Sequence, residues 1–348
     1  MLDDKSIMSK YDANNMYDLI YGLPEQLKEA FDISESFINQ LKLENIKNIV
    51  ISGMGGSAIG GDLVKTAVEN NLKIAVIVNR GYKLPGFVDK ETLVIASSYS
   101  GNTEETLSSY EDAKKRNANI IVITTGGKLK ERALEDNIPV ITIPSGLPPR
   151  AAIGYSFVPI YRVIEKLFVT EGESIETLFD FLKEVREDFA KEVPRGQNKA
   201  KALAEKIFGK LPLIYGTQGL TEAVAARWKG QLNENSKHPA FYNVFPELNH
   251  NEIMGFEGEG NLLKKFVVIV LRMPEEHERI DKRIKITKDL IRDKIAYFEE
   301  IWPKGENALQ RLFYHIMLGD FVSYYLALLN EKDPMEIDFI NTLKQRMG

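Results

Sequence analysis

The sequence contains no cysteine. This absence excludes disulfides, thiolate metal ligands and a cysteine nucleophile, and it is typical of proteins from a reducing cytoplasm. Histidine is also scarce, since the chain has only His238, His250, His277 and His315, and no two of them are four residues apart. That spacing does not favour a zinc site. We therefore expect a cytoplasmic protein that holds no metal.

Long apolar runs and clusters of basic residues are missing as well. No run of apolar residues approaches the ~20 needed to span a membrane. The formal net charge of -5 argues against a general nucleic-acid binder, although a local pocket can still accept an anion. With 348 residues and 44% hydrophobic content, the chain is long enough for two α/β domains. We expect neither a nucleic acid nor a membrane as a partner.

What the chain does contain is a series of short apolar runs separated by intervals of helix length. A helical lead-in of about 45 residues comes first, and five runs follow at 46–52, 74–78, 93–96, 120–123 and 140–143. Near-continuous apolar strands that alternate with amphipathic helices indicate a parallel sheet covered on both faces. Such a doubly wound domain binds its ligand beyond the carboxyl ends of the strands.

The second half of the chain repeats this pattern in outline. A charged helical stretch at 175–207 precedes apolar strands at 211–216, 265–271 and 295–298, and a long helix is expected at 307–330. The string IVISGMGGSAIGGDLV in the first half and LIYGTQGLTEAVAARW in the second both read as strand, glycine-containing loop and helix. We predict two doubly wound, flavodoxin-like α/β domains with parallel central sheets, at 1–170 and 171–348.

The strand at 93–96 runs into a segment rich in hydroxyl groups, SSYSGNTEET at 97–106. Hydroxyls donate hydrogen bonds, a glycine lets the backbone approach, and a helix N-terminus favours an anion, so the segment suits a phosphate monoester. We predict that Ser98, Ser100 and Thr103 bind the phosphate. The alternative is a turn with Thr103 or Asn102 as the helix N-cap, and both can hold together. The second half has no such loop, so we expect one sugar phosphate between the domains.

Four further segments accompany this loop, namely GMGGSAIGGD at 53–62, PPRAAIGY at 148–155, NENSK at 233–237 and NHNE at 249–252. The segment at 97–106 resembles the phosphosugar loop of the sugar isomerase (SIS) domain family, and the further segments, in this order, resemble one branch of it, the dual-specificity phosphoglucose/phosphomannose isomerases. The resemblance covers nearly the whole chain. It implies two SIS domains and a metal-independent aldose–ketose isomerisation of hexose 6-phosphates through a cis-enediol. It implies no cofactor. The first glycine loop does not match G-x-G-x-x-G, and no acidic residue ends the next strand, so a dinucleotide is not indicated.

The resemblance also implies roles for individual residues. The loop with Gly56 and Ser57 lines the sugar site of the family. Arg150 then stabilises the negative charge of the enediolate, as electrostatic preorganisation requires. Glu234 is the carboxylate that moves a proton between C1 and C2. Judged without the family, Arg150 would be a surface residue paired with a carboxylate and Glu234 a solvated helix-end residue.

Ring opening is assigned in the same way. His250 is implied to open the sugar ring in the site of a partner subunit, so a homodimer is expected, and Lys344 is implied to assist. A metal-ligand role for His250 and a second role near Glu234 for His238 are the alternatives. The family's bifunctional members usually carry a threonine where this chain has Ile337, a departure that bears on the mannose activity.

Two other functions remain open at this point. The first is an SIS-type amino-sugar phosphate isomerase or deaminase, which would use free ammonia because no glutaminase domain is present. The second is a non-catalytic sugar-phosphate-binding regulator. The lead-in of about 45 residues is short and not basic, which disfavours the DNA-binding helical domain that such a regulator would need.

Overall fold

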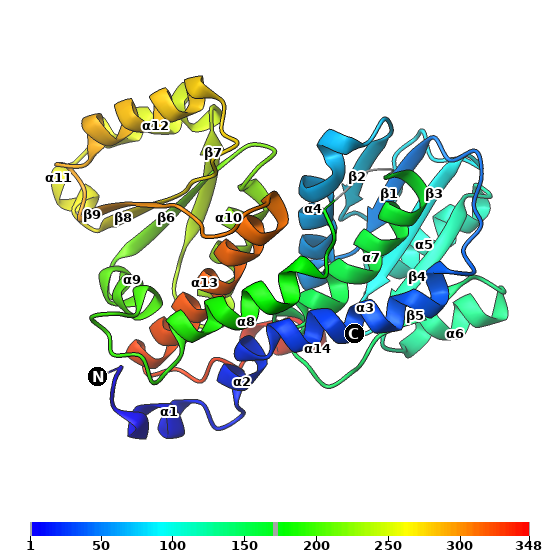
Figure 1. Ribbon diagram of the computed structural model, residues 1–348, viewed down its shortest axis with the longest axis horizontal. Coiled ribbons are helices and arrows are strands. Elements are labelled where there is room, and N and C mark those ends of the chain that lie inside the picture. Colours follow the sequence, from blue (N-terminus) through cyan, green and yellow to red (C-terminus); the bar gives the residue numbers. More distant parts are fainter. Residues whose placement is uncertain (1, 170–172, 348) are drawn as a thin grey trace. The chain divides into compact units, whose positions relative to one another are not determined.

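The structure is a computed structural model that describes residues 2–169 and 173–347. Its chain forms two compact units (Figure 1). Unit 2 comprises Gly22–Phe179, and unit 1 comprises the residues up to Tyr21 together with those from Asp180 onward. Each unit has its own parallel sheet, so the two-domain α/β architecture is confirmed.

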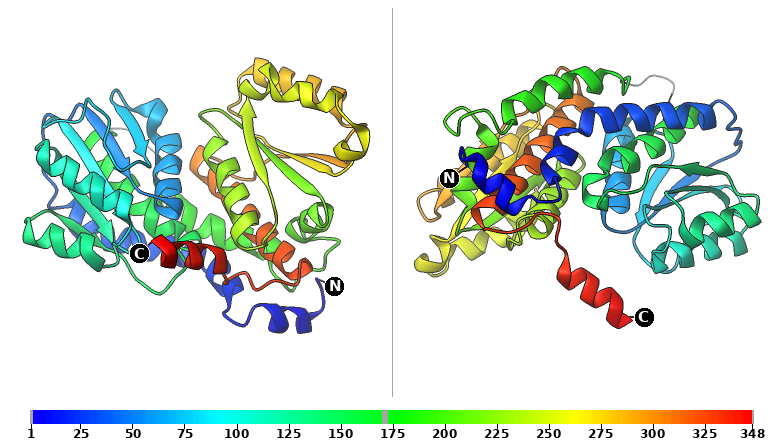
Figure 2. Two further views of the ribbon diagram at one scale, coloured as in Figure 1. Left: turned by 180° about the vertical axis from the view of Figure 1, so that it is seen from behind. Right: turned by 90° about the horizontal axis from the view of Figure 1, so that it is seen from below.

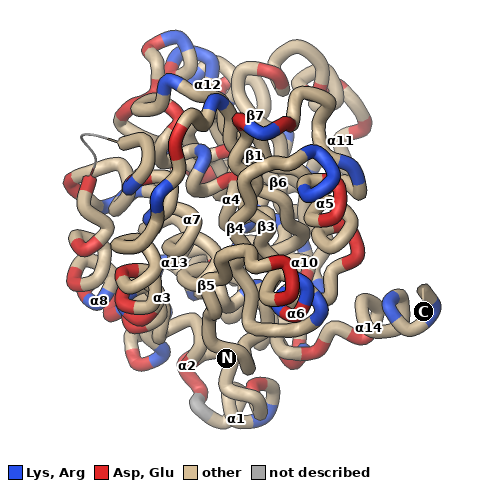
Figure 3. Tube along the Cα trace, turned by 90° about the vertical axis from the view of Figure 1, so that its right-hand side faces the viewer, with Lys and Arg blue, Asp and Glu red and all other residues tan. Residues whose placement is uncertain are grey.

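Unit 2 contains a five-stranded parallel sheet in the order β2-β1-β3-β4-β5. Every strand expected from the apolar runs is present. The strands are β1 (Asn48–Ser52), β2 (Ala75–Asn79), β3 (Thr92–Ser98), β4 (Asn119–Thr124) and β5 (Val140–Thr142). Because β1, β3 and β4 are central and covered on both faces, they have no charged residue, and the helices carry charges of both signs (Figure 3).

Helices cover both faces of this sheet. The helices are α3 (Leu23–Ile38), α4 (Gly55–Val68), α5 (Glu104–Lys115), α6 (Gly127–Glu135) and α7 (Ile153–Phe168). On one face Val94 and Val122 pack with Tyr110 of α5 and Leu129 of α6. On the other face α4 lies so close that a Cβ on Gly61 would be 2.8 Å from Ile51 Cγ2. The two layers can be followed in Figures 1 and 2.

Unit 1 contains a four-stranded parallel sheet in the order β7-β6-β8-β9. Its strands are β6 (Leu211–Thr217), β7 (Phe241–Phe245), β8 (Phe266–Leu271) and β9 (Tyr297–Ile301). In chain order this is 2-1-3-4, which is the order of the other sheet without its fifth strand. The sequence analysis missed β7, an edge strand whose Phe241 and Tyr242 are exposed, because it lacks an apolar run.

In unit 1 one long helix, α13 (Ala308–Leu329), packs against α1, α2, α9 and α10. The others are α1 (Lys5–Tyr11), α2 (Met16–Tyr21), α8 (Thr177–Phe189), α9 (Lys199–Ile207), α10 (Glu222–Glu234), α11 (Gly260–Leu263), α12 (Glu278–Ile291) and α14 (Asp338–Met347). The charged stretch expected as helical at 175–207 is two helices, α8 and α9. Residues 190–198 separate them, and this segment contains Pro194 and Gly196, which do not favour helix.

Helix α13 bears on the expectation that no apolar segment is long enough to span a membrane. By length and composition it could cross a membrane, the one helix in the described part of the chain that meets both criteria. All of its most apolar window is buried inside the unit, as in the core helix of a globular unit. The helix is buried on all sides from Leu312 to Leu329.

The first helices pack within unit 1 although they come first in the chain. The Tyr17 ring of α2 lies 5.9 Å from the Phe321 ring and 5.5 Å from the Tyr324 ring, both on α13. Aromatic contacts of this kind stabilise packing beyond the area that they bury. The division into units thus differs from the expected domain ranges of 1–170 and 171–348 in placing the first 21 residues with the later half.

Each sheet has a position where neighbouring strands lead into helices on opposite faces. In unit 2 this position lies between β1 and β3, where Ser52 is paired with Ala96. In unit 1 it lies between β6 and β8. Ligands of open α/β sheets bind in the crevice at this topological switch point, beyond the carboxyl ends of the strands.

Candidate active site

The hydroxyl-rich segment lies at the switch point of unit 2, directly after β3. Ser98 is buried, and its Oγ lies 2.9 Å from Thr103 Oγ1. Thr103 is the N-cap residue of α5, as the structural alternative expected, yet its side chain caps no amide of the helix. The two hydroxyls therefore face each other in the loop. Ser100, the third predicted ligand, is exposed in the same turn.

Gly101 holds this turn in shape. Its amide donates to Ser98 Oγ at 3.1 Å, and its φ of +68° lies in the region that favours glycine. A Cβ at this position would be 1.8 Å from Gly126 O, in the loop after β4. Asn102 connects the same two loops, because its Oδ1 accepts from Lys128 N at 3.2 Å. A close backbone contact thus requires the glycine between the hydroxyls.

The first glycine loop contacts the hydroxyl loop. Ser57, buried on the first turn of α4, accepts a hydrogen bond on its Oγ from Tyr99 N at 3.2 Å. A Cβ on Gly53 would be 2.8 Å from Ser97 O. One on Gly56 would be 2.6 Å from Pro149 O, in the turn that carries Arg150. Small residues therefore let three loops meet at the ends of the strands.

Arg150 lies in this third loop, a 3-10 turn at Pro149–Ala151, and is only 5% exposed. Burial of the side chain contradicts the reading of Arg150 as an ordinary surface arginine. Its loop is joined to the hydroxyl loop, since Leu147 N donates to Tyr99 Oη at 3.0 Å. Gln26 of α3 binds the residues that follow Arg150. Its side chain donates to Ala151 O at 2.8 Å and accepts from Gly154 N at 2.6 Å.

Unit 2 therefore brings together six predicted site residues, Gly56, Ser57, Ser98, Ser100, Thr103 and Arg150, on three adjoining loops. Sequence reasoning missed the two residues that join these loops, Tyr99 and Gln26. Tyr99 was visible as the one aromatic residue within the hydroxyl segment. Burial raises the pKa of its phenol, which stays a neutral hydrogen-bonding group. Gln26 has no signal in the sequence, because its partners lie 125 and 128 residues away.

Unit 1 carries the other three predicted residues on three different elements. Glu234 is the last residue of α10 and is half-buried. His250 ends a 3-10 turn at Glu247–His250 and is exposed, while its neighbour Leu248 is fully buried and anchors the turn. Lys344 is on α14, a helix without buried residues.

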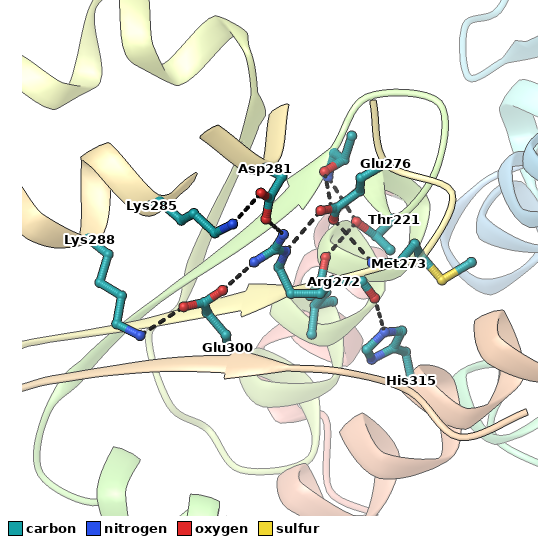
Figure 4. Close-up of polar contacts among 11 residues, drawn as sticks. Thr221, Arg272, Met273, Glu276, Asp281, Lys285, Lys288, Glu300 and His315 are labelled. Atoms are coloured by element: carbon teal, nitrogen blue, oxygen red, sulfur yellow. Dashed lines mark hydrogen bonds and ion pairs between the residues drawn. The ribbon is translucent and has the colours of Figure 1, made fainter. Parts of the chain in front are cut away.

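The switch point of unit 1 is built differently, from charged residues (Figure 4). Arg272 follows β8 directly and is 1% exposed. It donates to Glu276 at 2.8 Å, to Asp281 at 2.7 Å and to Glu300, so three carboxylates surround one guanidinium. Burial raises the pKa of Glu276, and the charge of Arg272 opposes that shift. An arginine directly after an apolar strand is the one trace of this cluster in the sequence.

Glu276 in this cluster is held as a bound anion would be. Its Oε1 accepts from Met273 N at 3.1 Å and from Thr217 Oγ1 at 3.3 Å, while Oε2 accepts from Arg272. An amide, a hydroxyl and a guanidinium are the donors that phosphate sites use. The chain after β8 reads RMPE at 272–275, so this position has no run of hydroxyl residues.

The other histidines have structural partners. His238 Nε2 donates to Lys210 O at 2.6 Å, and His277 Nδ1 accepts from Arg279 N at the start of α12. His315 is wholly buried, with Nε2 2.9 Å from Arg272 O. Within residues 2–169 and 173–347, no group of three His, Asp or Glu residues is placed to hold a metal ion.

A five-stranded 2-1-3-4-5 sheet with a hydroxyl loop at its switch point, followed by a 2-1-3-4 copy, defines a protein of two flavodoxin-like α/β domains. Residues 42–148 match the SIS domain family, and residues 196–347 match the bacterial phospho-glucose isomerase C-terminal SIS domain. A protein of Caldicellulosiruptor bescii named bifunctional phosphoglucose/phosphomannose isomerase is 51% identical over 96% of this chain and 99% of its own length. The chain belongs to the bifunctional phosphoglucose/phosphomannose isomerase family.

Two further comparisons show the breadth of this group. A D-glucosamine-6-phosphate 4-epimerase of Sulfolobus acidocaldarius is 30% identical over 87% of this chain and 90% of its own length. Among solved structures, a hypothetical protein of Thermus thermophilus superposes with a TM-score of 0.74 at 13% identity, covering 99% of this chain and 93% of its own. At that identity the likeness concerns the fold alone.

Proposed function

We propose that the protein is a metal-independent isomerase that interconverts glucose 6-phosphate and mannose 6-phosphate with fructose 6-phosphate. The observation that carries this proposal is the loop after β3, where Ser98 Oγ and Thr103 Oγ1 lie 2.9 Å apart at the switch point of the sheet. Membership in the family supports the choice of hexose phosphates. The enzyme would act in the cytoplasm, in carbohydrate metabolism such as glycolysis or gluconeogenesis.

In this mechanism unit 2 binds the substrate. Ser98, Ser100 and Thr103 donate hydrogen bonds to the phosphate, and the uncapped amides at the start of α5 add a partial positive charge. Gly56 and Ser57 lie against the sugar. Binding by neutral donors suits a small dianion, because the loop itself has no lysine or arginine.

The chemistry follows from the remaining residues. His250 and Lys344 assist ring opening, in which the ring oxygen gains a proton and the anomeric hydroxyl loses one as the ring C–O bond breaks. Glu234 removes the proton from C2 of the aldose and returns it to C1, while Arg150 stabilises the enediolate. Reprotonation of either face of C2 yields the glucose or the mannose epimer.

A homodimer is part of the same proposal, with His250 donated to the site of the partner subunit. Two features support this role. The side chain of His250 is exposed, so a partner subunit can reach it, and the buried Leu248 anchors the same turn.

The test is a coupled assay of fructose 6-phosphate conversion with EDTA present. We expect both glucose 6-phosphate and mannose 6-phosphate, with turnover unaffected by the chelator. Glucose 6-phosphate alone would mean that Ile337 abolishes the mannose reaction. Loss of turnover with EDTA would refute the metal-independent mechanism. The absence of both products would refute the proposal.

An amino-sugar enzyme is the second candidate, favoured by the relative named D-glucosamine-6-phosphate 4-epimerase. It predicts turnover of glucosamine 6-phosphate, either with release of ammonia or by epimerisation, and no turnover of fructose 6-phosphate alone. A third possibility, a sugar-phosphate sensor, predicts phosphosugar binding without turnover, and Glu234→Gln would then change nothing. Our proposal expects this substitution to lower kcat by at least ~10²-fold with phosphate affinity kept.

A further inference from the structure

One residue of α13 accepts hydrogen bonds from both residues that follow Glu234. Helix α10 ends at Glu234 and packs along α13 (Figure 1). Asn235 and Ser236 come next, and both are fully buried. Asn235 Nδ2 donates to Ser323 Oγ at 2.9 Å, and Ser236 Oγ donates to Ser323 O at 2.6 Å. Ser323 is itself fully buried.

The direction of these bonds is fixed. The hydroxyl of Ser323 donates to Asp320 O at 2.7 Å, so its oxygen is left to accept from Asn235. A second residue near the end of α13 adds to the same anchor, because Asn330 Nδ2 donates to Ser236 O at 2.8 Å. Both the side chain and the main chain of Ser236 are therefore bound to α13.

The backbone after Glu234 turns sharply. Lys237 has a φ of +49°, a conformation uncommon in residues other than glycine. The turn is closed by His238 N, which donates to Leu232 O at 3.1 Å, and by Asn233 Nδ2, which donates to His238 O at 2.9 Å. Unfavourable backbone of this kind persists only where the surroundings determine it, and it is concentrated at functional sites.

We propose that Ser323 is a positioning residue that holds the Glu234 carboxylate in place through Asn235 and Ser236. The proposal rests on the proposed function, in which Glu234 moves a proton between C1 and C2. One carboxylate must reach two carbons in turn, and displacement by ~1 Å can lower the rate ~10²-fold. An anchor of buried hydrogen bonds to the central helix of the unit limits such displacement.

The experiment compares two variants that each remove one of the bonds between α13 and the segment after Glu234; Ser323→Ala also removes the bond from Ser323 Oγ to Asp320 O. Ser323→Ala removes the acceptor of Asn235, and Ser236→Ala removes the donor to Ser323 O. The matched control is Tyr325→Phe, also on α13, which removes a buried hydrogen bond from Tyr325 Oη to Phe189 O at 2.6 Å. For each variant we would measure Tm, kcat and KM, and the isotope effect on kcat with glucose 6-phosphate deuterated at C2.

We expect Ser323→Ala and Ser236→Ala to lower kcat ~10-fold or more, to change KM less than ~2-fold and to enlarge the isotope effect, because proton transfer becomes slower. Tyr325→Phe should lower Tm to a similar extent and leave kcat and the isotope effect at wild-type values. A merely structural role for Ser323 would give all three variants the same kinetics.

The outcomes separate this proposal from the one on which it rests. If the wild type does not isomerise hexose phosphates, or Glu234→Gln is fully active, the proposed mechanism fails and the positioning role with it. If the wild type is active, Glu234→Gln is not, and both alanine variants keep kcat and the isotope effect, the positioning role alone is refuted. Should Ser323→Ala fail to fold, Ser236→Ala decides, because it leaves the Ser323 hydroxyl in place.

Discussion

Replacing Gly101 by alanine tests the geometry of the phosphate loop. The new Cβ would be 1.8 Å from Gly126 O and 2.8 Å from Thr124 Oγ1. Carbon and oxygen atoms in proteins rarely approach closer than ~3.3 Å, so one of the two loops must move by ~1.5 Å. Gly126 O is a backbone atom and cannot avoid the contact by a rotamer change.

The control is Gly209→Ala, because Gly209 has the same φ of +68° and no atom within 4 Å of an added Cβ. Both substitutions force alanine into the left-handed region, which costs about 1–2 kcal/mol. Gly101→Ala alone adds the overlap with Gly126, for which overpacking measurements suggest ~1–3 kcal/mol more. The difference between the two free energies of unfolding therefore isolates the contact between the loops.

Gly101→Ala should lower activity as well as stability. Gly101 N donates to Ser98 Oγ at 3.1 Å, so a displaced loop also displaces a residue that we propose binds the phosphate. We expect kcat/KM to fall ~10²-fold and inhibition by inorganic phosphate to weaken, whereas Gly209→Ala keeps both. Denaturant unfolding and steady-state kinetics measure these quantities. Equal losses of stability in the two variants, or wild-type kcat/KM in Gly101→Ala, would refute the reasoning.

Three more predictions concern single side chains. Burial lowers the pKa of His315 to about 4, below its ordinary value near 6.5. The unfolding free energy should therefore fall by up to ~3 kcal/mol as the pH drops from 7 to 4. Replacing His315 by asparagine should flatten this pH dependence, and an unchanged profile would contradict the prediction. Glu276→Ala should lower the unfolding free energy by ~3 kcal/mol, because it leaves the buried Arg272 with an incomplete set of partners. The control, Asp32→Ala, removes an exposed ion pair and should cost less than ~1 kcal/mol. Equal losses in the two variants would contradict the prediction. Ser98→Ala should raise the inhibition constant of inorganic phosphate ~10-fold, whereas Ser108→Ala on α5 should leave it unchanged.

Much of the fold could be predicted because the strands are buried. A parallel strand covered on both faces must be apolar along its length, so β1, β3, β4, β6 and β8 all appear as apolar runs in the sequence. The exception, β7, lies at an edge of its sheet and exposes Phe241 and Tyr242. Four of its five residues, FYNVF, favour strand, but Asn243 interrupts them, so no continuous apolar run marks β7 in the sequence.

The candidate site was predictable where its residues are close in sequence. Ser98, Ser100 and Thr103 fall within six residues, so the strand-to-helix turn brings them together without help from distant parts of the chain. Gln26 supports the loop of Arg150 from a helix more than 120 residues earlier, and no local pattern identifies it. The same limit applies to Ser323, whose link to Asn235 spans 88 residues.

The two switch points show how one topology can serve two purposes. In unit 2 the space beyond β3 is lined by hydroxyls and amides and has no charged residue in its loop, so an incoming phosphate would supply the charge. In unit 1 the guanidinium of Arg272 occupies the corresponding space, and each of its three nitrogens already donates to a carboxylate of the same unit. Arg272 thus uses three of its five N–H donors on carboxylates of its own unit, and removing a partner from a buried pair costs more than the pair itself contributes. The switch point of unit 1 thus differs from that of unit 2, because charged side chains of the same chain fill the place that hydroxyls and amides take beyond β3.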